Sequence, residues 1–422
     1  MPVHGQGGAF GGLVVNEAIN ALAAPTGLAA RLPARTVRET HPQFAYVTGL
    51  GGLTGNEPAD QCGACQRAGG IRSCTAILPF GRKCVASESM DAYTLNRRYN
   101  QGEMDITLIG ELVSDEVRRA MELRQIDSRT LLETGIALGM YEVGLELTRW
   151  LVSKLWVGAP SGTDNEGYAE FVGLDNQIIT GRRDALANTL CPDLDSLVYA
   201  LDSQYDTTDS GGSVLVRAMT RMYSVLTQRA ERFGLRPVTW VIVTSPEMRY
   251  LLLDMWAAAY TTAIGYKLPT APSNYIVDLS ASSANRDRVM AEGKINILGA
   301  PVEVIADEGI PVIEDSGVYY SSIYFVPLTY AGRRPATYLQ FFDYTLSEQL
   351  PYQFTFTDGG RVQWWVTANG PCFTLSGAIK ARVVLEVPHL AGKITGVQFT
   401  PDTALPFPSG LGSGSGVGSR IP

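Results

Sequence analysis

The stretch Thr130-Leu-Leu-Glu-Thr-Gly-Ile-Ala-Leu-Gly-Met-Tyr-Glu-Val-Gly-Leu-Glu-Leu-Thr-Arg-Trp-Leu-Val-Ser-Lys-Leu-Trp-Val157 decides the fold. Its apolar residues recur every three or four positions, which is the period of one face of an α-helix. At 1.5 Å per residue, a helix over this stretch is roughly 40 Å long, well above the ordinary length. We therefore predict a long central helix that ends at Gly158-Ala-Pro160. Its apolar face consists of Leu132, Ile136, Met140, Val143, Leu147, Trp150, Leu151 and Leu155.

Downstream of this helix, helical and strand patterns follow one another. A second amphipathic helix is predicted over residues 212–233, then a buried strand over 238–244. Ser245-Pro246-Glu247 has the pattern of a helix start, with a serine N-cap and proline at the first position. Seven further strand patterns complete an α+β protein, and the third and second from last form a hairpin across Asp358-Gly-Gly360. They cover residues 294–298, 302–305, 322–327, 337–342, 352–357 with 361–366, and 372–387.

Upstream of the long helix the chain is rich in glycine and proline. Residues 1–60 favour an extended arm on a neighbouring subunit, because a long structureless segment is uncommon inside a compact domain. Within residues 61–110, strand patterns at 74–79 and 84–87 flank Phe80-Gly-Arg82-Lys83 and predict a two-stranded excursion. Phe80, Arg82 and Lys83 are therefore candidates for contacts between subunits, although an ordinary solvated lysine is the simpler interpretation of Lys83.

Composition and charge exclude several classes of protein. Of the 422 residues, 45% are hydrophobic and 18% are charged, which is a globular balance and not that of a disordered chain. There are 34 Lys and Arg against 42 Asp and Glu, so the net charge is −8. Without a basic face or tail, direct nucleic-acid recognition is disfavoured. No run of apolar residues is long enough to span a membrane, and the N-terminus lacks a signal peptide pattern, so we expect synthesis in a cytoplasm.

Catalytic motifs are absent from the sequence. There is no Gly-x-Ser-x-Gly elbow, no His-Glu-x-x-His and no phosphate-binding Gly-x-x-x-x-Gly-Lys-Ser/Thr motif. The three histidines, His4, His41 and His389, are far apart in the sequence. We therefore expect no catalytic residue and no enzyme activity.

Four of the six cysteines lie close together in the sequence and form the one group of residues there that could bind a metal ion or form disulfides. Cys62-Gly-Ala-Cys65 has the spacing of two thiolates on one tetrahedral metal ion, but Cys74 and Cys84 have nine residues between them and fit a zinc site less well. Structural zinc, disulfides formed after release into an oxidising medium, and unpaired thiols all remain open. We commit to no metal and no cofactor. Cys191 and Cys372 are expected to be isolated and packed.

The order of these elements resembles that of the major capsid proteins of tailed bacteriophages, which have the Hong Kong 97 type fold. Three short stretches are similar to segments of that family: Phe171-Val-Gly-Leu-Asp-Asn-Gln-Ile-Ile-Thr-Gly181, Val238-Thr-Trp-Val-Ile-Val-Thr-Ser-Pro246 and Ile297-Leu-Gly-Ala-Pro-Val-Glu-Val304. The resemblance implies an N-terminal arm, an E-loop, a peripheral domain with the long spine helix, an axial domain and a C-terminal extension. These parts would cover residues 1–60, 61–110, 111–205 with 330–390, 206–329 and 391–422, respectively.

The resemblance also implies a function. Such a chain would form pentamers and hexamers of an icosahedral phage head that encloses double-stranded DNA without reading its sequence. It would assemble in the host bacterial cytoplasm and remain in the virion capsid, with scaffold, portal and decoration proteins as possible partners and no membrane. Some relatives cross-link through an E-loop lysine, and Lys83 occupies a comparable place, but no Asn and Glu partners for it can be identified.

Two alternatives are kept beside the capsid interpretation. One is an encapsulin-like nanocompartment shell, although the long N-terminal arm and C-terminal extension argue against it. The other, from a different class, is a metal-dependent enzyme built on Cys62–Cys84, which lacks a histidine or a carboxylate pair at catalytic spacing. A tail or surface-layer protein would instead form tubes or sheets.

Overall fold

The computed structural model describes thirteen parts of the chain, and its described residues form two compact units. Unit 1 contains the residues up to Ser196 together with Pro327–His389, and unit 2 contains Leu197–Val326 and the residues from Leu390 onward. The sequence-based boundaries between peripheral and axial domains, at 206 and 329, lie near these divisions. The described residues are 27–38, 41–50, 71–91, 93–95, 97, 128–160, 168–200, 209–253, 256, 291–344, 355–358, 361–370 and 372–399.

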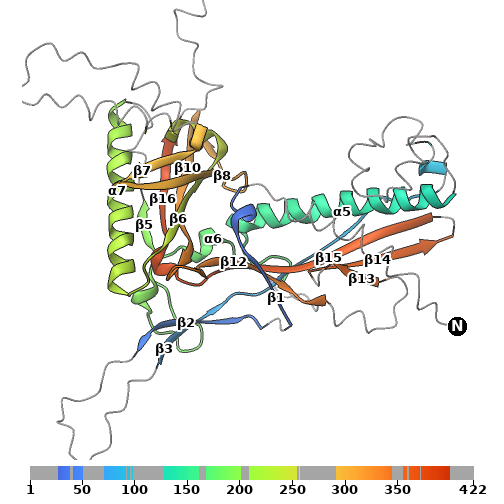
Figure 1. Cartoon of the computed structure of the whole chain (residues 1–422), viewed down its shortest axis with the longest axis horizontal. Coiled ribbons are helices and arrows are strands. Elements are labelled where there is room, and N and C mark those ends of the chain that lie inside the picture. The colour runs from blue at the N-terminus through green and yellow to red at the C-terminus, as the bar shows by residue number, and fades with distance from the viewer. Residues whose placement is uncertain are drawn as a thin grey trace, which may run out of the picture. The chain divides into compact units, whose positions relative to one another are not determined.

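Unit 1 is built on the long helix α5 (Ser128–Val157), which lies along a six-stranded sheet (Figure 1). The apolar face predicted from the sequence is confirmed, because its members from Met140 to Leu155 are buried. Glycine allows the helix to approach strand β15 (Cys372–Leu385) closely. A Cβ atom at Gly377 would lie 2.8 Å from Cγ1 of Val143, which is too close for a larger residue without a shift.

The sheet of unit 1 joins strands from distant parts of the chain. Its order is β1-β12-β15-β14-β13, and β4 also pairs with β15. The predicted hairpin at Asp358–Gly360 is confirmed, since β13 and β14 are antiparallel and Asp358 is opposite Val362. β1 lies parallel to β12 in this sheet, so residues that the sequence assigned to an arm on a neighbour belong to the chain's own sheet. The strands not yet given are β1 (Ala34–Val37), β4 (Gly81–Ala86), β12 (Thr337–Phe342), β13 (Thr355–Asp358) and β14 (Val362–Asn369).

A separate two-stranded sheet corrects the predicted excursion. β2 (Gln43–Leu50) pairs with β3 (Ile71–Ile77) in antiparallel register from Gln43 opposite Ile77 to Leu50 opposite Ile71. The sequence pattern predicts instead that β3 pairs with β4 across Phe80–Lys83. That pairing is wrong because Leu78 and Phe80 are buried rather than exposed in a turn. β4 bonds to β15, almost 300 residues later in the chain.

Most of the second sheet lies in unit 2. Its order is β5-β16-β10-β6-β8-β7, and β9 and β11 also pair with β10. The predicted second helix is confirmed as α7 (Asp209–Arg232), and its expected apolar residues from Leu215 to Ala230 are fully buried. Tyr223 of α7 meets Trp240 of β6 edge to face, with 5.5 Å between the ring centroids. The strands are β5 (Leu197–Ala200), β6 (Thr239–Thr244), β7 (Lys294–Ile297), β8 (Ala300–Ala306), β9 (Ile313–Asp315), β10 (Val318–Tyr330), β11 (Arg334–Pro335) and β16 (Gly392–Phe399).

Short helices complete the described structure, and together with the two sheets they confirm the predicted α+β class. They are η1 (Ala29–Arg31), α6 (Leu174–Gln177), η2 (Pro192–Leu194) and η4 (Pro388–Leu390). Ser245 begins a helical segment as predicted, and its Oγ accepts the Met248 amide at 3.4 Å. Within the described residues, no helix combines the length and hydropathy needed to cross a bilayer.

Candidate functional site: the root of the β2–β3 hairpin

The β2–β3 hairpin meets the rest of unit 1 through a small apolar cluster. Tyr46, Cys74, Leu78 and Leu194 form this cluster, each at most 3% exposed. We call these four residues the hairpin root. An isolated two-stranded sheet is marginally stable in water, so the hairpin depends on its root for a defined position.

A buried arginine fixes the chain on both sides of the hairpin. Arg382 of β15 donates to the carbonyl oxygen of His41 at 3.0 Å, just before β2, and to that of Leu78 at 2.6 Å, just after β3. Its Nε donates to Oε1 of Gln340 at 2.8 Å. The guanidinium also lies 4.3 Å from the centroid of the Phe80 ring. Burial lowers the pKa of Arg382 to about 10, so the group stays charged at neutral pH.

A second arginine contacts the aromatic side chain of the root. Arg182 lies over the ring of Tyr46, 5.2 Å from its centroid, and donates to the carbonyl oxygen of Gln177. Burial raises the pKa of Tyr46, and the positive charge of Arg182 opposes that rise. The phenol is therefore neutral at physiological pH and is held by a cation–π contact.

The loop 182–191 docks on β3 through Asp184. Its Oδ2 accepts the Thr75 amide at 2.7 Å, and its Oδ1 accepts those of Leu186 and Ala187 at 2.8 and 2.7 Å. These three hydrogen bonds lower the pKa of the carboxyl group. The Ala185 amide donates to the Thr75 carbonyl oxygen at 2.8 Å, so the loop continues the hydrogen bonding of the hairpin.

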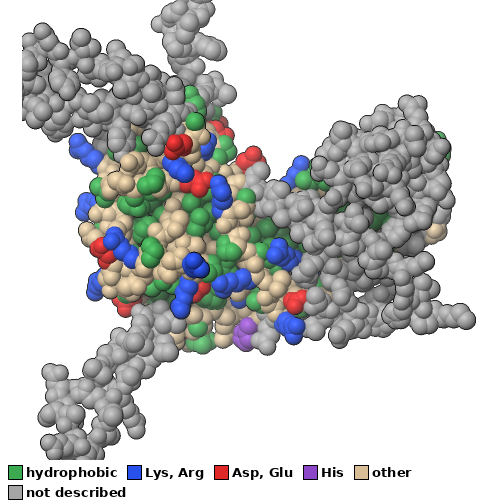
Figure 2. Space-filling model, viewed as in Figure 1, with side chains coloured by type: hydrophobic (Ala, Val, Ile, Leu, Met, Phe, Trp, Pro, Cys, Tyr) green, Lys and Arg blue, Asp and Glu red, His purple; other side chains and the backbone are tan. Residues whose placement is uncertain are grey.

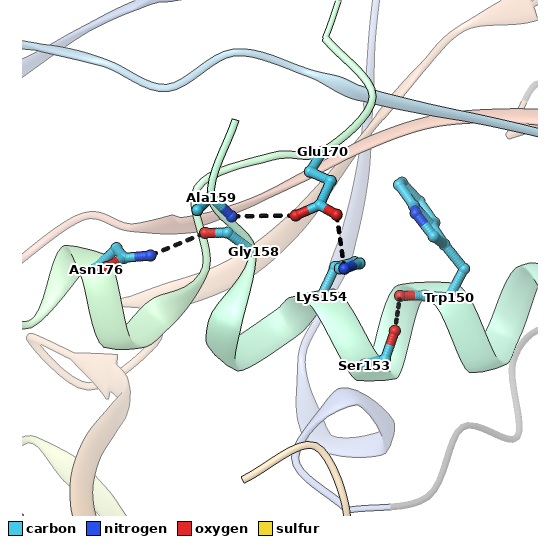
Figure 3. Close-up of polar contacts among 7 residues, drawn as sticks. All are labelled: Trp150, Ser153, Lys154, Gly158, Ala159, Glu170 and Asn176. Carbon is cyan, nitrogen blue, oxygen red and sulfur yellow. Dashed lines mark hydrogen bonds and ion pairs between the residues drawn. The ribbon is translucent and has the colours of Figure 1, made fainter. Parts of the chain in front are cut away.

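The path of the chain into this loop is set at the end of α5 (Figure 3). Lys154 and Glu170 form an ion pair of 2.6 Å, and the Ala159 amide donates to the same carboxylate at 3.2 Å. The hydrogen bond from Lys154 lowers the pKa of Glu170. Asn176 Nδ2 donates to the Gly158 carbonyl oxygen at 3.0 Å. The end of the spine helix therefore holds α6, which directly precedes the loop.

Gln177 connects α6 to the sheet from a buried position. Its Nε2 donates to the carbonyl oxygens of Val172 and Val383 at 2.8 and 3.0 Å, and its Oε1 accepts the Leu385 amide at 3.1 Å. All of its strong hydrogen-bonding groups are therefore used inside unit 1. Helix, sheet and loop form one rigid support for the hairpin root.

The structure separates the cysteines that the sequence groups into one cluster. Cys74 lies in β3 and forms a disulfide with Cys191, whereas Cys84 is exposed on β4 in another sheet. Cys62 and Cys65 lie outside the described residues. The expectation that Cys191 is isolated is wrong, because folding brings it to β3 across 117 residues. A zinc site that contains both Cys74 and Cys84 is not formed.

The three contact candidates are placed differently from expectation. Phe80 is buried under Arg382 and is not available to a neighbour in this arrangement. Arg82 and Lys83 lie on β4, opposite Lys380 and Ile379 of β15. Lys83 is exposed, but it belongs to the large sheet rather than to the tip of an excursion. Of the three histidines, His4 lies outside the described residues, His41 is exposed, and His389 is buried in η4.

Arg382, Asp184 and Cys191 were not identified from the sequence. An even number of cysteines signals that pairs can form, but spacing does not reveal which cysteines pair. In the sequence, the one sign of the role of Arg382 is that an arginine stands within an apolar strand pattern. Its partners His41 and Leu78 lie more than 300 residues away along the chain.

Comparisons with known proteins find similarity to solved structures. No family model and no curated protein matches the sequence. The chain is similar to the capsid of Myoviridae phage XM1, with 10% identity, a TM-score of 0.41, and coverage of 89% of this chain and 92% of that one. It is similar to the capsid of cyanophage P-SCSP1u, with 9% identity, a TM-score of 0.41 and coverage of 88% and 87%. It is also similar to the SrpI encapsulin of Synechococcus elongatus, with 10% identity, a TM-score of 0.36 and coverage of 88% and 86%.

Proposed function

We propose that the protein is a structural subunit that self-assembles into a closed shell, the head of a tailed phage. The observation that carries the proposal is the β2–β3 hairpin, a two-stranded sheet outside both large sheets and fixed to unit 1 by its root. Such a hairpin has no partner strand in the described part of its own chain. A closed shell needs heterologous contacts between neighbours, and an element of this kind can supply them.

The cargo of this shell is proposed to be double-stranded DNA that the wall does not grip. The net charge of the chain is −8, which opposes tight binding to phosphates. On the face in Figure 2, Asp and Glu side chains lie among the described Lys and Arg side chains. By the resemblance noted above, the assembly consists of pentamers and hexamers, forms in the host bacterial cytoplasm, and can include scaffold, portal and decoration proteins.

The enzyme alternative loses its structural basis. It required Cys62, Cys65, Cys74 and Cys84 to share one metal ion, but Cys74 is joined to Cys191 and Cys84 lies in a different sheet. The shell proposal needs no cofactor.

A shortened hairpin tests the proposal directly. Leu50 and Ile71 are paired residues at the end of the ladder, so an Asn-Gly turn can replace residues 51–70 and close the hairpin. We expect the full chain to elute as large particles and this variant to remain small, with an unchanged circular dichroism spectrum and melting temperature. The measurement is size exclusion with light scattering.

The matched control removes residues 410–418, which are glycine- and serine-rich. This control is expected to assemble like the full chain. Assembly of the hairpin variant into particles of normal size would contradict the proposed role of the hairpin.

A further inference from the structure

The Cys74–Cys191 pair joins two segments whose relative position defines the hairpin root. Cys74 belongs to β3, and Cys191 directly precedes η2. Their Cα atoms are 6.4 Å apart, within the range for a disulfide. Closing this bond therefore ties one strand of the hairpin covalently to the loop beside it.

Hydrogen bonds hold the two segments together independently of the sulfur atoms. Asp184 accepts the Thr75 amide at 2.7 Å, and the Ala185 amide donates to the Thr75 carbonyl oxygen at 2.8 Å. Both bonds involve the residue that follows Cys74. The two thiols of a reduced chain would consequently remain close to each other, ready to be oxidised without rearrangement of the fold.

The surroundings of the two sulfur atoms are unequal. Cys74 is only 1% exposed within the hairpin root, whereas Cys191 is partly buried at its edge. A small oxidant in solution reaches Cys191 more easily. This difference assigns an order to the two chemical steps of oxidation.

We propose that Cys74 and Cys191 form a redox staple, open as two thiols in a reducing compartment and closed as a disulfide after transfer to an oxidising one. The oxidant is a small-molecule disulfide. The Cys191 thiolate attacks one of its sulfur atoms, forms a mixed disulfide and releases one small thiol. The Cys74 thiolate then attacks Cys191 Sγ and displaces the second small thiol. Two protein thiols and one small disulfide become one protein disulfide and two small thiols.

The closed staple stabilises the hairpin root by limiting how far its two segments can separate. In a chain-entropy description, a cross-link over a long loop removes much of the freedom of the open state. The bond spans 117 residues, so its effect on complete unfolding is expected to be large, and local opening of the root is limited because its two segments stay tied to each other. This inference goes beyond the proposed shell function and does not require assembly to be true.

The first test identifies the bond in the purified full-length chain. The protein is equilibrated with oxidised or reduced glutathione, denatured, alkylated and analysed by peptide mass. We expect the linked Cys74–Cys191 peptide in the oxidised sample and two alkylated cysteines in the reduced sample. Alkylation of both cysteines in the oxidised sample, or a linkage to a different cysteine, would overturn the proposal.

The second test measures what the bond does. Reduction of the wild type should accelerate hydrogen exchange of the Thr75 amide by about tenfold or more and lower the melting temperature by roughly 5–10 °C. The double variant Cys74→Ser, Cys191→Ser should exchange like the reduced wild type in both conditions. Cys372→Ser, which changes a cysteine on β15, is the control and should respond to glutathione like the wild type.

Two results of the second test would overturn the proposal. One is an equal response to reductant in the double variant, which would place the redox effect at other cysteines. The other is one zinc ion per reduced chain that is lost in the double variant, since Cys74, Asp184 and Cys191 offer ligand atoms within 4.8 Å of one another. Zinc content is measured by mass spectrometry after dialysis without chelator.

Discussion

At the scale of single residues, Arg382 shows how one side chain can fix the entry and exit of an extended element. It bonds to carbonyl oxygens before β2 and after β3 and stacks on Phe80. A planar guanidinium can direct several donors at once, and a lysine ammonium cannot reproduce that geometry. Position 382 therefore requires the geometry of a guanidinium group and not only a positive charge.

We predict that Arg382→Lys lowers the free energy of unfolding by about 2–4 kcal/mol, because buried carbonyl groups lose their donors. Urea unfolding followed by circular dichroism measures this change. Arg149→Lys is the matched control, since Arg149 is exposed and pairs with Glu146 at 2.7 Å on the helix surface. The control should change stability by no more than about 0.5 kcal/mol. Equal effects at the two positions would refute the role given to Arg382.

The carboxyl group of Asp184 should make the stability of the hairpin root depend on pH. Its folded pKa lies below the ordinary value of 3.8, because three amides stabilise the carboxylate. The stability it contributes is therefore present above that ordinary pKa and is lost as the pH falls through the lower folded pKa. Hydrogen exchange at Thr75 should accelerate below about pH 4 after correction for the intrinsic rate.

The variant Asp184→Asn should show faster exchange at Thr75 at neutral pH and should lose the acid-dependent step. An amide group has only one acceptor oxygen, so it cannot satisfy all three donors. Retention of the same acid step in this variant would mean that another carboxyl group controls the root.

At the scale of elements, the end of the spine helix depends on two glycines. A Cβ atom at Gly173 would overlap the Trp156 carbonyl oxygen and lie 2.7 Å from the Gly158 nitrogen. We expect Gly173→Ala to destabilise the protein by about 1–3 kcal/mol through overpacking. Thermal unfolding measures the effect.

Gly144, inside α5, provides the matched control. A Cβ atom there would meet nothing within 4 Å, so Gly144→Ala should stabilise the helix by about 0.5–1 kcal/mol. Opposite signs for the two substitutions support the close approach of α6 to the helix end. A loss of stability in both variants would indicate that this region tolerates no alanine in place of glycine, and it would not support a specific contact at Gly173.

The elements that could be predicted from the sequence are those with a local signal. α5 and α7 have long apolar periods, and β13–β14 has a glycine turn between two strand patterns. The pairing of β2 with β3 was not predicted, because twenty residues separate the two strands in the sequence. The pairing of β4 with β15 joins residues as distant in the sequence as Ala86 and Ser376, and local pattern carries no information about such a distant partner.

The candidate site was less predictable than the fold for the same reason. The sequence drew attention to Cys74, but it grouped that residue with near neighbours in the chain. The partner that folding provides is Cys191, brought close by α6 and the loop docked through Asp184. Sites assembled from distant segments require the tertiary structure before their members can be recognised.

At the scale of the whole molecule, the described residues form two units and a separate hairpin, which we propose to lie between copies of the chain. Neither unit requires a catalytic centre for this role. The sequence resemblance to tailed-phage capsid proteins and the rooted hairpin lead to the same proposal. Assembly of many copies is therefore the property to test.

Negative-stain imaging of the full-length chain, expressed alone and purified over a range of salt concentrations, tests this claim most directly. Closed polyhedral particles, or rings of five and six subunits, are the predicted result. A monomer at all protein and salt concentrations, confirmed by light scattering, would contradict self-assembly into a shell.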